Sequence, residues 1–142
     1  MFDYNRTLYA PEAGAFYPGV DGLVRRLSSR YRLCLIGRDQ EGRSATLEAA
    51  GIRDCFSVVR FVPEKTPEAF SQVVGSGPLP VSVVGDRMRE EIRIGNRLGY
   101  RTIWVRAGKF ASEAPDAETG EPTHIVPSVL AVECLLEREF KQ

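Results

Sequence analysis

The residues of this sequence best suited to chemistry are two aspartates and a lysine: Asp3, Lys65 and Asp86. Carboxylates bind divalent cations and can act as nucleophiles, and an ammonium group neutralises negative charge that develops in a transition state. These residue types suit chemistry on an anionic group such as a phosphate. They can act together only if the fold brings them to one place. The strands and helices around them therefore determine whether they form a site.

Strand-like and helix-like segments alternate along the chain. Four short apolar runs rich in β-branched residues are predicted strands, buried on both faces: 31–36, 56–61, 81–84 and 102–105. Helical periodicity or capping signals are found at 20–27, from Pro67, across 88–98 and from Val129. The segment 107–123 is a predicted loop. The alternation predicts an α/β fold, a three-layer Rossmann-like sandwich with a mainly parallel sheet and helices on both faces.

In such a sheet, ligands bind beyond the carboxyl ends of the strands. Asp3 ends the first predicted strand and Gly37 ends the second. Asp86 follows the strand 81–84, and Lys65 lies just before the helix that follows the third strand. Because the carboxyl ends of parallel strands meet at one edge, we expect these residues to converge there.

The run Asp3-Tyr4-Asn5-Arg6-Thr7-Leu8 resembles the nucleophile loop, Asp-x-Asp-x-Thr, of the haloacid dehalogenase-like (HAD) superfamily. Segments 64–70 and 85–92 resemble the third and fourth motifs of that superfamily, in the same order, and the resemblance extends to about Val105. Most members are Mg²⁺-dependent phosphatases. The resemblance implies one HAD-like domain over 1–142 that hydrolyses phosphate monoesters. It also implies no cap domain, since only 33 residues separate Asp3 from Gly37.

The resemblance also implies roles for single residues. Asp3 would be the nucleophile and become an aspartyl phosphate, and Lys65 would neutralise the phosphoryl group. The implied ligands of Mg²⁺ are Asp3, the backbone carbonyl of Asn5, Asp86 and Glu91. Glu91, preferred to Glu90 by its spacing, would hold a ligand water or orient Lys65. The residues implied to shape the loop or contact the phosphate are Thr7, Gly37, Arg38 and Lys65.

Two positions depart from the family pattern. Asn5 stands where the family has the aspartate that acts as general acid and base, and an amide cannot transfer a proton at neutral pH. Gly37 stands where the family has serine or threonine, so a hydroxyl donor is missing, and Arg38 could take over phosphate binding. The chain is therefore expected to be a slow enzyme or, as the alternative, a catalytically impaired binding or assembly module.

The first strand is expected to be truncated. A central parallel strand needs about five residues, and Met1-Phe2 provides two. Three explanations are open: the true start lies upstream, the strand has been lost, or a partner chain fills its place. We favour the first.

Two further functions remain as alternatives. A dehalogenase also lacks the second acid, but it usually has a cap and an arginine after the nucleophile strand. A phosphoacceptor receiver domain also combines an aspartate, a hydroxyl residue and a lysine on a parallel sheet. Its aspartate ends the third strand, however, and Asp3 stands at the start of this chain.

The amino-acid composition limits the classes of binding partner expected for this protein. Nineteen basic and nineteen acidic residues balance, so no basic surface is expected to attract nucleic acid or a membrane. The expected partner is a small-molecule or macromolecular phosphoester, and a homo-oligomer that covers the capless site is left open. Cys34, Cys55 and Cys134 are odd in number and lie among apolar residues, so we expect three buried free thiols and a cytoplasmic protein. The single histidine, His124, is expected to be structural.

Overall fold

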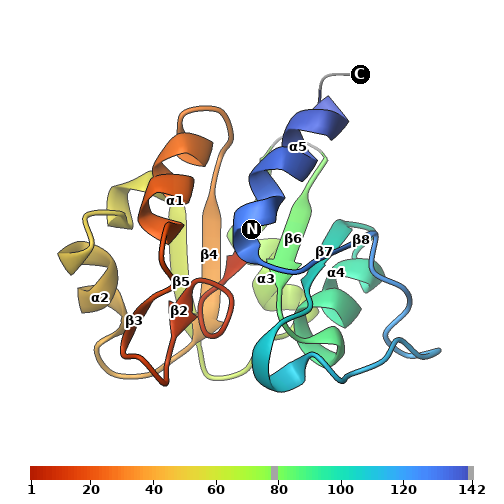
Figure 1. Ribbon diagram of the computed structural model, residues 1–142. Helices are drawn as coiled ribbons and strands as arrows, with labels where there is room; N and C mark the ends of the chain where they lie inside the picture. Colours follow the sequence, from red (N-terminus) through yellow and green to blue (C-terminus); the bar gives the residue numbers. More distant parts are fainter. Residues whose placement is uncertain (78–79, 141–142) are drawn as a thin grey trace.

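The computed structural model describes residues 1–77 and 80–140, and a six-stranded sheet in the order β5-β4-β1-β6-β7-β8 runs through it (Figure 1). Its strands are β1 (Phe2–Asp3), β4 (Cys34–Arg38), β5 (Val58–Val62), β6 (Ser82–Gly85), β7 (Arg101–Val105) and β8 (His124–Val126). Every neighbouring pair in this sheet is parallel. The predicted α/β class and parallel sheet are confirmed.

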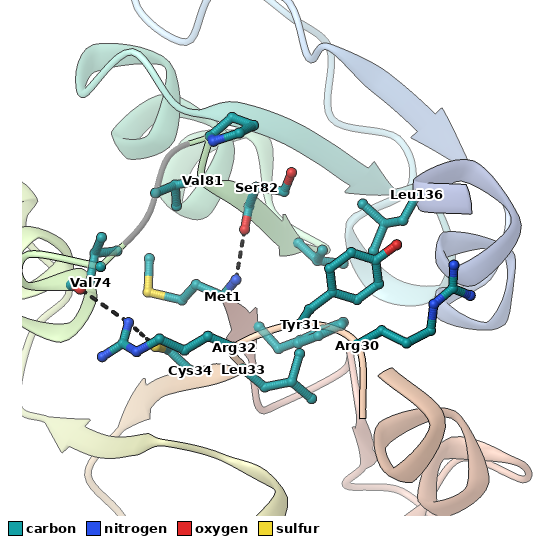
Figure 2. Close-up of a pocket in the computed structure, with 14 residues that line it drawn as sticks. Met1, Arg30, Tyr31, Arg32, Leu33, Cys34, Val74, Val81, Ser82 and Leu136 are labelled. Atoms are coloured by element: carbon teal, nitrogen blue, oxygen red, sulfur yellow. Dashed lines mark hydrogen bonds between the residues drawn. The ribbon is translucent and has the colours of Figure 1, made fainter. Parts of the chain in front are cut away.

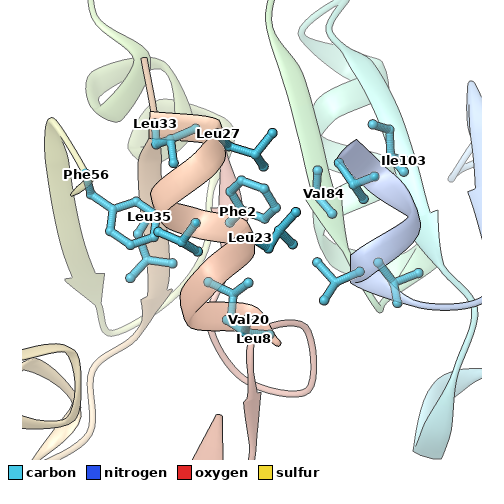
Figure 3. Close-up of a cluster of buried hydrophobic side chains, with 14 of the residues drawn as sticks. Phe2, Leu8, Val20, Leu23, Leu27, Leu33, Leu35, Phe56, Val84 and Ile103 are labelled. Atoms are coloured by element: carbon cyan, nitrogen blue, oxygen red, sulfur yellow. The ribbon is translucent and has the colours of Figure 1, made fainter. Parts of the chain in front are cut away.

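Helices cover both faces of the sheet. They are α1 (Val20–Ser28), α2 (Arg43–Ala49), α3 (Pro67–Val74), α4 (Arg93–Arg97) and α5 (Val132–Phe140), with short helical turns η1 (Arg53–Cys55), η2 (Met88–Ile92), η3 (Gly108–Phe110) and η4 (Val129–Ala131). Helices α1 and α5 pack on one face, over the cluster that contains Leu35 (Figure 3). Helices α3 and α4 pack on the other, where Ile36 is buried. Successive residues of β4 thus enter opposite cores, as a strand buried on both faces requires.

The central strand β1 has only two residues, as the sequence predicted. It is nevertheless bound on both sides, by β4 and by β6. The amino nitrogen of Met1 donates to the carbonyl of Ser82 at 2.7 Å, and Val84 N donates to the carbonyl of Met1 at 2.9 Å. Phe2 is buried in the main core. The loop that follows β1 therefore starts from a fixed central position.

Some boundaries and elements differ from the sequence-based expectations. Strands β4 and β5 begin two or three residues later than predicted and end after the apolar runs, at Arg38 and Val62. Helix α2 was not predicted, because it buries only Leu47 and shows no apolar period. Strand β8 was not predicted either, because three residues give no periodic signal. A two-stranded hairpin, β2 (Tyr9–Ala10) and β3 (Ala15–Phe16), follows the nucleophile loop.

The expectation of three buried thiols is wrong in part. Cys34 is buried, Cys55 is half-buried and Cys134 is exposed. Cys134 lies in α5 between Val132 and Leu135, which face the core, so the helical period turns it outward. All three are free thiols. Within the described ranges, no helix combines the length and apolar character that crossing a membrane requires.

Helix α4 lies very close to the sheet, and Gly95 allows this. A Cβ atom at Gly95 would lie 2.7 Å from the methyl carbon of Thr102 and 3.4 Å from side-chain atoms of Val83. Thr102 is fully buried, and its hydroxyl group is held by hydrogen bonds with Asn96 and Thr123, so it cannot move aside. Gly95 therefore lets α4 pack directly against β7.

We predict that Gly95→Ala lowers the free energy of unfolding by about 1–2 kcal/mol, because the added methyl group overpacks the interface between α4 and β7. Gly22→Ala is the matched control. Gly22 lies in α1, and its added Cβ would meet only the mobile end of Arg26, at 3.1 Å. The control variant should gain about 0.5–1 kcal/mol of helix stability. Denaturant unfolding of both variants measures the difference, and two changes of the same sign would contradict this packing argument.

Candidate active site

The order of the strands places the site. The chain goes outward from β1 to β4 and β5 on one side, then returns to β6, β7 and β8 on the other. The order therefore reverses between β1 and β6, and the carboxyl ends of strands at such a reversal leave a crevice for ligands. Phe2 pairs with Val84, so Asp3 at the end of β1 and Asp86 directly after β6 lie next to each other at this crevice.

Lys65 joins two of the acids. Its Nζ donates to Oδ1 of Asp3 in a very short contact, and to Oε1 of Glu91 at 2.5 Å. Thr7 donates from its hydroxyl group to the other oxygen of Asp3 at 3.1 Å. All four side chains are buried. Burial alone would lower the pKa of Lys65, but the charges of Asp3 and Glu91 outweigh it and raise that pKa, so Lys65 stays a cation.

The buried centre has an excess of negative charge. Asp3, Asp86 and Glu91 each offer a carboxylate oxygen within 4.8 Å of the others, against the single ammonium of Lys65. Burial, and then the charges of Glu91 and Asp3, raise the pKa of Asp86 to about 9. Asp86 Oδ2 and Glu91 Oε2 are buried and have no hydrogen-bond partner among the described residues. Unpartnered carboxylate oxygens that converge in this way fit a divalent cation.

Glu91 reaches the centre because of two local features. It lies in the π-helical turn η2, a type of turn that is frequent at functional sites. The turn lies close to the end of β6, where a Cβ atom at Gly85 would be only 2.6–2.9 Å from the side-chain carbons of Glu91. Only glycine leaves room there for the glutamate to pass. No pattern in the sequence indicated this role of Gly85.

Trp104 holds the backbone of Asp86 in place. Its indole nitrogen donates to the carbonyl of Asp86 at 2.9 Å, and its ring is buried with Met88 and Ile92. Sequence reasoning assigned Trp104 to the core, which is correct, but missed the hydrogen bond. The signal available was the rule that a buried indole N–H needs an acceptor.

A pocket of about 220 Å³ opens at this crevice. Of the residues that the sequence nominated, those that line it are Asp3, Asn5, Arg38, Lys65, Asp86 and Glu91. Thr7 lies behind the wall and contacts Asp3. Glu90, which the sequence offered as the alternative to Glu91, lines the pocket as well. Sequence reasoning did not assign a role here to four further lining residues: Arg6, Arg43, Arg87 and Phe110. They come from loops and helix starts, where no apolar period marks a position as facing the site.

Gly37, which the sequence also nominated, does not line the pocket. A Cβ atom there would lie 3.0 Å from Cβ of Tyr4 and 3.1 Å from the ring of Phe61. Tyr4 is itself buried in an aromatic cluster with Tyr9, Phe16 and Phe61. The aromatic rings thus take the space that a side chain at position 37 would need.

A second cavity, of about 270 Å³, lies at the opposite, amino-terminal end of the strands (Figure 2). Met1, Leu33, Cys34 and Val81 are among its lining residues. Although it is the larger, no carboxylate is found among the described residues that line it. The smaller pocket, at the carboxyl ends of the strands, is therefore the candidate active site.

Comparison with known proteins points to one family. Residues 66–132 match a family model described as HAD-hydrolase-like. A D,D-heptose 1,7-bisphosphate phosphatase from B. bronchiseptica, complexed with magnesium and phosphate, superposes with a TM-score of 0.70 at 16% identity, over 97% of each chain. The chain is HAD-like in its fold and in the sequence of its second half. No curated protein matches it.

Two other solved structures are similar to this chain in fold. An uncharacterized protein from Listeria monocytogenes serotype 4b has a TM-score of 0.76 at 16% identity, covering 96% of this chain and 95% of the other. A 2-haloacid dehalogenase from Pseudomonas syringae pv. Tomato has a TM-score of 0.68 at 19% identity, covering 87% of this chain but 54% of the other. The chain spans a little over half of several similar structures. Within residues 1–77 and 80–140, no cap domain is found.

The charge excess at the HAD-like centre predicts how Asp86→Asn behaves. A carboxyl group whose pKa rises on folding, here from 3.8 to about 9, stabilises the fold fully only below its unfolded pKa, and that stability is lost as the pH rises towards the folded pKa. In chelating buffer at pH 7, Asp86→Asn should therefore raise the free energy of unfolding by about 1–3 kcal/mol. The gain should grow from about pH 4 to about pH 9.

The measurement is denaturant unfolding across that pH range. The control is Asp54→Asn, an exposed aspartate in η1, which should leave stability unchanged. A loss of stability in Asp86→Asn that exceeds the control would show that the centre is not short of positive charge.

Proposed function

We propose that this chain is a Mg²⁺-dependent phosphate monoester hydrolase of HAD type in which Asp3 is the nucleophile. The observation that carries the proposal is the position of the Asp3 carboxylate. It lines the pocket, and hydrogen bonds from Lys65 and Thr7 hold one oxygen each. Such a carboxylate is oriented before substrate arrives, which removes part of the entropy of the attack.

The acid cluster supports the metal part of the proposal. Asp3, Asp86 and Glu91 would hold the ion, with Asn5 at the wall of the same pocket. Hard oxygen donors of this kind are the ones Mg²⁺ prefers. When bound, Mg²⁺ supplies positive charge that offsets the negative charge spread over the phosphoryl oxygens.

The remaining steps of the proposed reaction depend on side chains of the protein. A carboxylate oxygen of Asp3 forms a bond to phosphorus while the ester oxygen leaves, and water later hydrolyses the aspartyl phosphate. The ammonium of Lys65 remains beside Asp3 and Glu91 and neutralises charge on the transferred group. Asn5 cannot give the leaving oxygen a proton. Esters whose leaving group is stable as an anion are therefore the favoured substrates.

A catalytically impaired binding module is the second candidate. The observation that favours it is the pair of departures at Asn5 and Gly37. A serine or threonine side chain at position 37 would meet Tyr4 and Phe61 in tight contacts of 3.0–3.1 Å, so restoring the missing hydroxyl donor would require these residues to shift. Such a module would bind a phosphoester, small or macromolecular, in the same pocket and release it unchanged.

We predict that the protein hydrolyses an activated aryl phosphate in the presence of Mg²⁺, and that Asp3→Asn lowers turnover by at least 10³-fold because the nucleophile is lost. Chelation of Mg²⁺ should stop the reaction, and added Mg²⁺ should restore it. Release of the phenol, followed by absorbance, measures this. Asp54→Asn serves as the surface control.

Two outcomes would reject this proposal. Binding of phosphate esters without turnover in wild type would favour the binding module. Turnover of a haloacid that survives removal of Mg²⁺ would favour a dehalogenase, the activity of one of the similar structures.

We also predict that Asn5→Asp raises turnover, because the new carboxyl group supplies the missing proton. General acid–base catalysis is worth about 10²–10⁴-fold, and the gain should be largest for alkyl phosphates, whose leaving groups need a proton most. The measurement is kcat for a series of esters whose leaving groups differ in pKa. The slope of log kcat against that pKa should become shallower in the variant, and an unchanged slope would show that position 5 takes no part in proton transfer.

A further inference from the structure

Four arginines surround the acidic centre: Arg6, Arg38, Arg43 and Arg87. They come from the loop after β1, the end of β4, the start of α2 and the segment after β6. Together with Lys65 they give the pocket five cationic side chains, against four acidic ones. The acids Asp3, Asp86 and Glu91 are buried in the centre, so the excess of positive charge lies at the rim.

Arg6 adopts an unfavourable backbone conformation. Its φ of 61° is the only positive value among the non-glycine residues that the structure describes. Strain of this kind concentrates at functional sites, because a residue without a function there would be replaced by glycine at no steric cost. Its ion pair, with Glu12 at 2.9 Å, is with a side chain that is 70% exposed, so a ligand can displace that carboxylate easily.

Arg43 is held in place by neutral groups. It donates to the carbonyl of Arg38 at 2.7 Å and to the side-chain oxygen of Gln40 at 3.0 Å, and it lies over the ring of Tyr4 at 4.9 Å. In the part of the chain that the structure describes, no carboxylate forms an ion pair with it. Its position is therefore fixed while its charge is uncompensated, a condition that favours binding of an external anion.

The other two arginines differ. Glu90 contacts Arg38 at 3.5 Å and Arg87 at 2.8 Å, and Glu113 lies 3.7 Å from Arg87. Their charge is already shared with carboxylates of the chain itself. Arg6 and Arg43 are thus the two rim cations most available to a ligand.

We infer that Arg6 and Arg43 bind a second anionic group on the substrate, so that the substrate is a phosphomonoester that also carries another phosphate or a carboxylate. The inference rests on the proposed function, because the first phosphate is the one presented to Asp3. The rim arginines recognise the part of the substrate that does not react. Arginine suits this role, since its planar fork binds phosphate and carboxylate groups through two hydrogen bonds.

The test is equilibrium binding of ligands that cannot be hydrolysed, at constant Mg²⁺, by calorimetry. Bisphosphonates built on ethane, butane and hexane chains are each compared with the alkylphosphonate of the same chain, which has a single anionic group. A second comparison, with the phosphonocarboxylate of the same chain, shows whether the second anion is a phosphate or a carboxylate. Wild type should prefer at least one doubly anionic ligand by about tenfold or more, the effect of one charge-assisted contact. That exceeds the statistical factor of about two for a symmetric ligand.

The variants are Arg6→Gly and Arg43→Gln, with Arg26→Gln as the control. Arg26 is an exposed arginine of α1 that is paired with Glu133 and lies away from the pocket. Both rim variants should lower the preference several-fold, and the control should keep it. Arg6→Gly also relieves the strained backbone, so its melting temperature should not fall, which separates loss of binding from loss of folding.

The inference would be overturned if wild type preferred the doubly anionic ligand by less than about twofold at every alkyl chain length. It would also be overturned if both rim variants kept the preference. Turnover of simple aryl phosphates without any preference would overturn it and leave the proposed function standing. If the preference depends on Arg6 and Arg43 but the protein shows no turnover, binding of a second anion by these arginines is supported and the proposed hydrolase activity is rejected.

Discussion

The buried contact of Lys65 with Asp3 and Glu91 is the interaction on which the rest of the site depends. Removing carboxylates from water costs several kcal/mol each unless they are paired, and here one ammonium serves two of them. The contact therefore requires three distant segments to meet with little tolerance: the end of β1, the residue before α3 and the turn η2. Gly85 and Trp104 help to hold these segments together. Gly85 makes room for Glu91, and Trp104 holds the backbone of Asp86.

The contact leaves the centre short of positive charge, and that shortage separates the pocket into two zones. The acids at the bottom attract a cation, and the arginines at the rim attract an anion. A phosphate ester between the two zones would meet positive charge on both sides once a cation is bound. In a pocket that water can enter, each of these electrostatic contributions is weaker than in a closed site, so several charges must act together.

The sequence predicted the sheet, its parallel direction and the convergence of Asp3, Lys65 and Asp86, because strand ends in a parallel fold meet at one edge. It could not predict residues whose role depends on close packing. The space around Gly37 is set by Tyr4 and Phe61, which are far from it in sequence or on another strand. Arg43 reaches the pocket from α2, a helix with a single buried residue, so no periodic pattern indicated its position. The strain at Arg6 can be read only from the backbone.

The departures at Asn5 and Gly37 are related to the arginines at the rim, because they concern different parts of the same ligand. Replacing the acid and the hydroxyl donor removes groups that act on the reacting phosphate. If the arginines bind a second anion as proposed, they would act on the rest of the ligand, and binding energy from remote groups can be used to orient the reacting one. Orientation is effective only if the nucleophile is already fixed, and the two contacts of Asp3 with Lys65 and Thr7 meet that condition. A pocket with a fixed carboxylate, no proton donor at position 5 and a cationic rim is therefore suited to strongly anionic esters with good leaving groups.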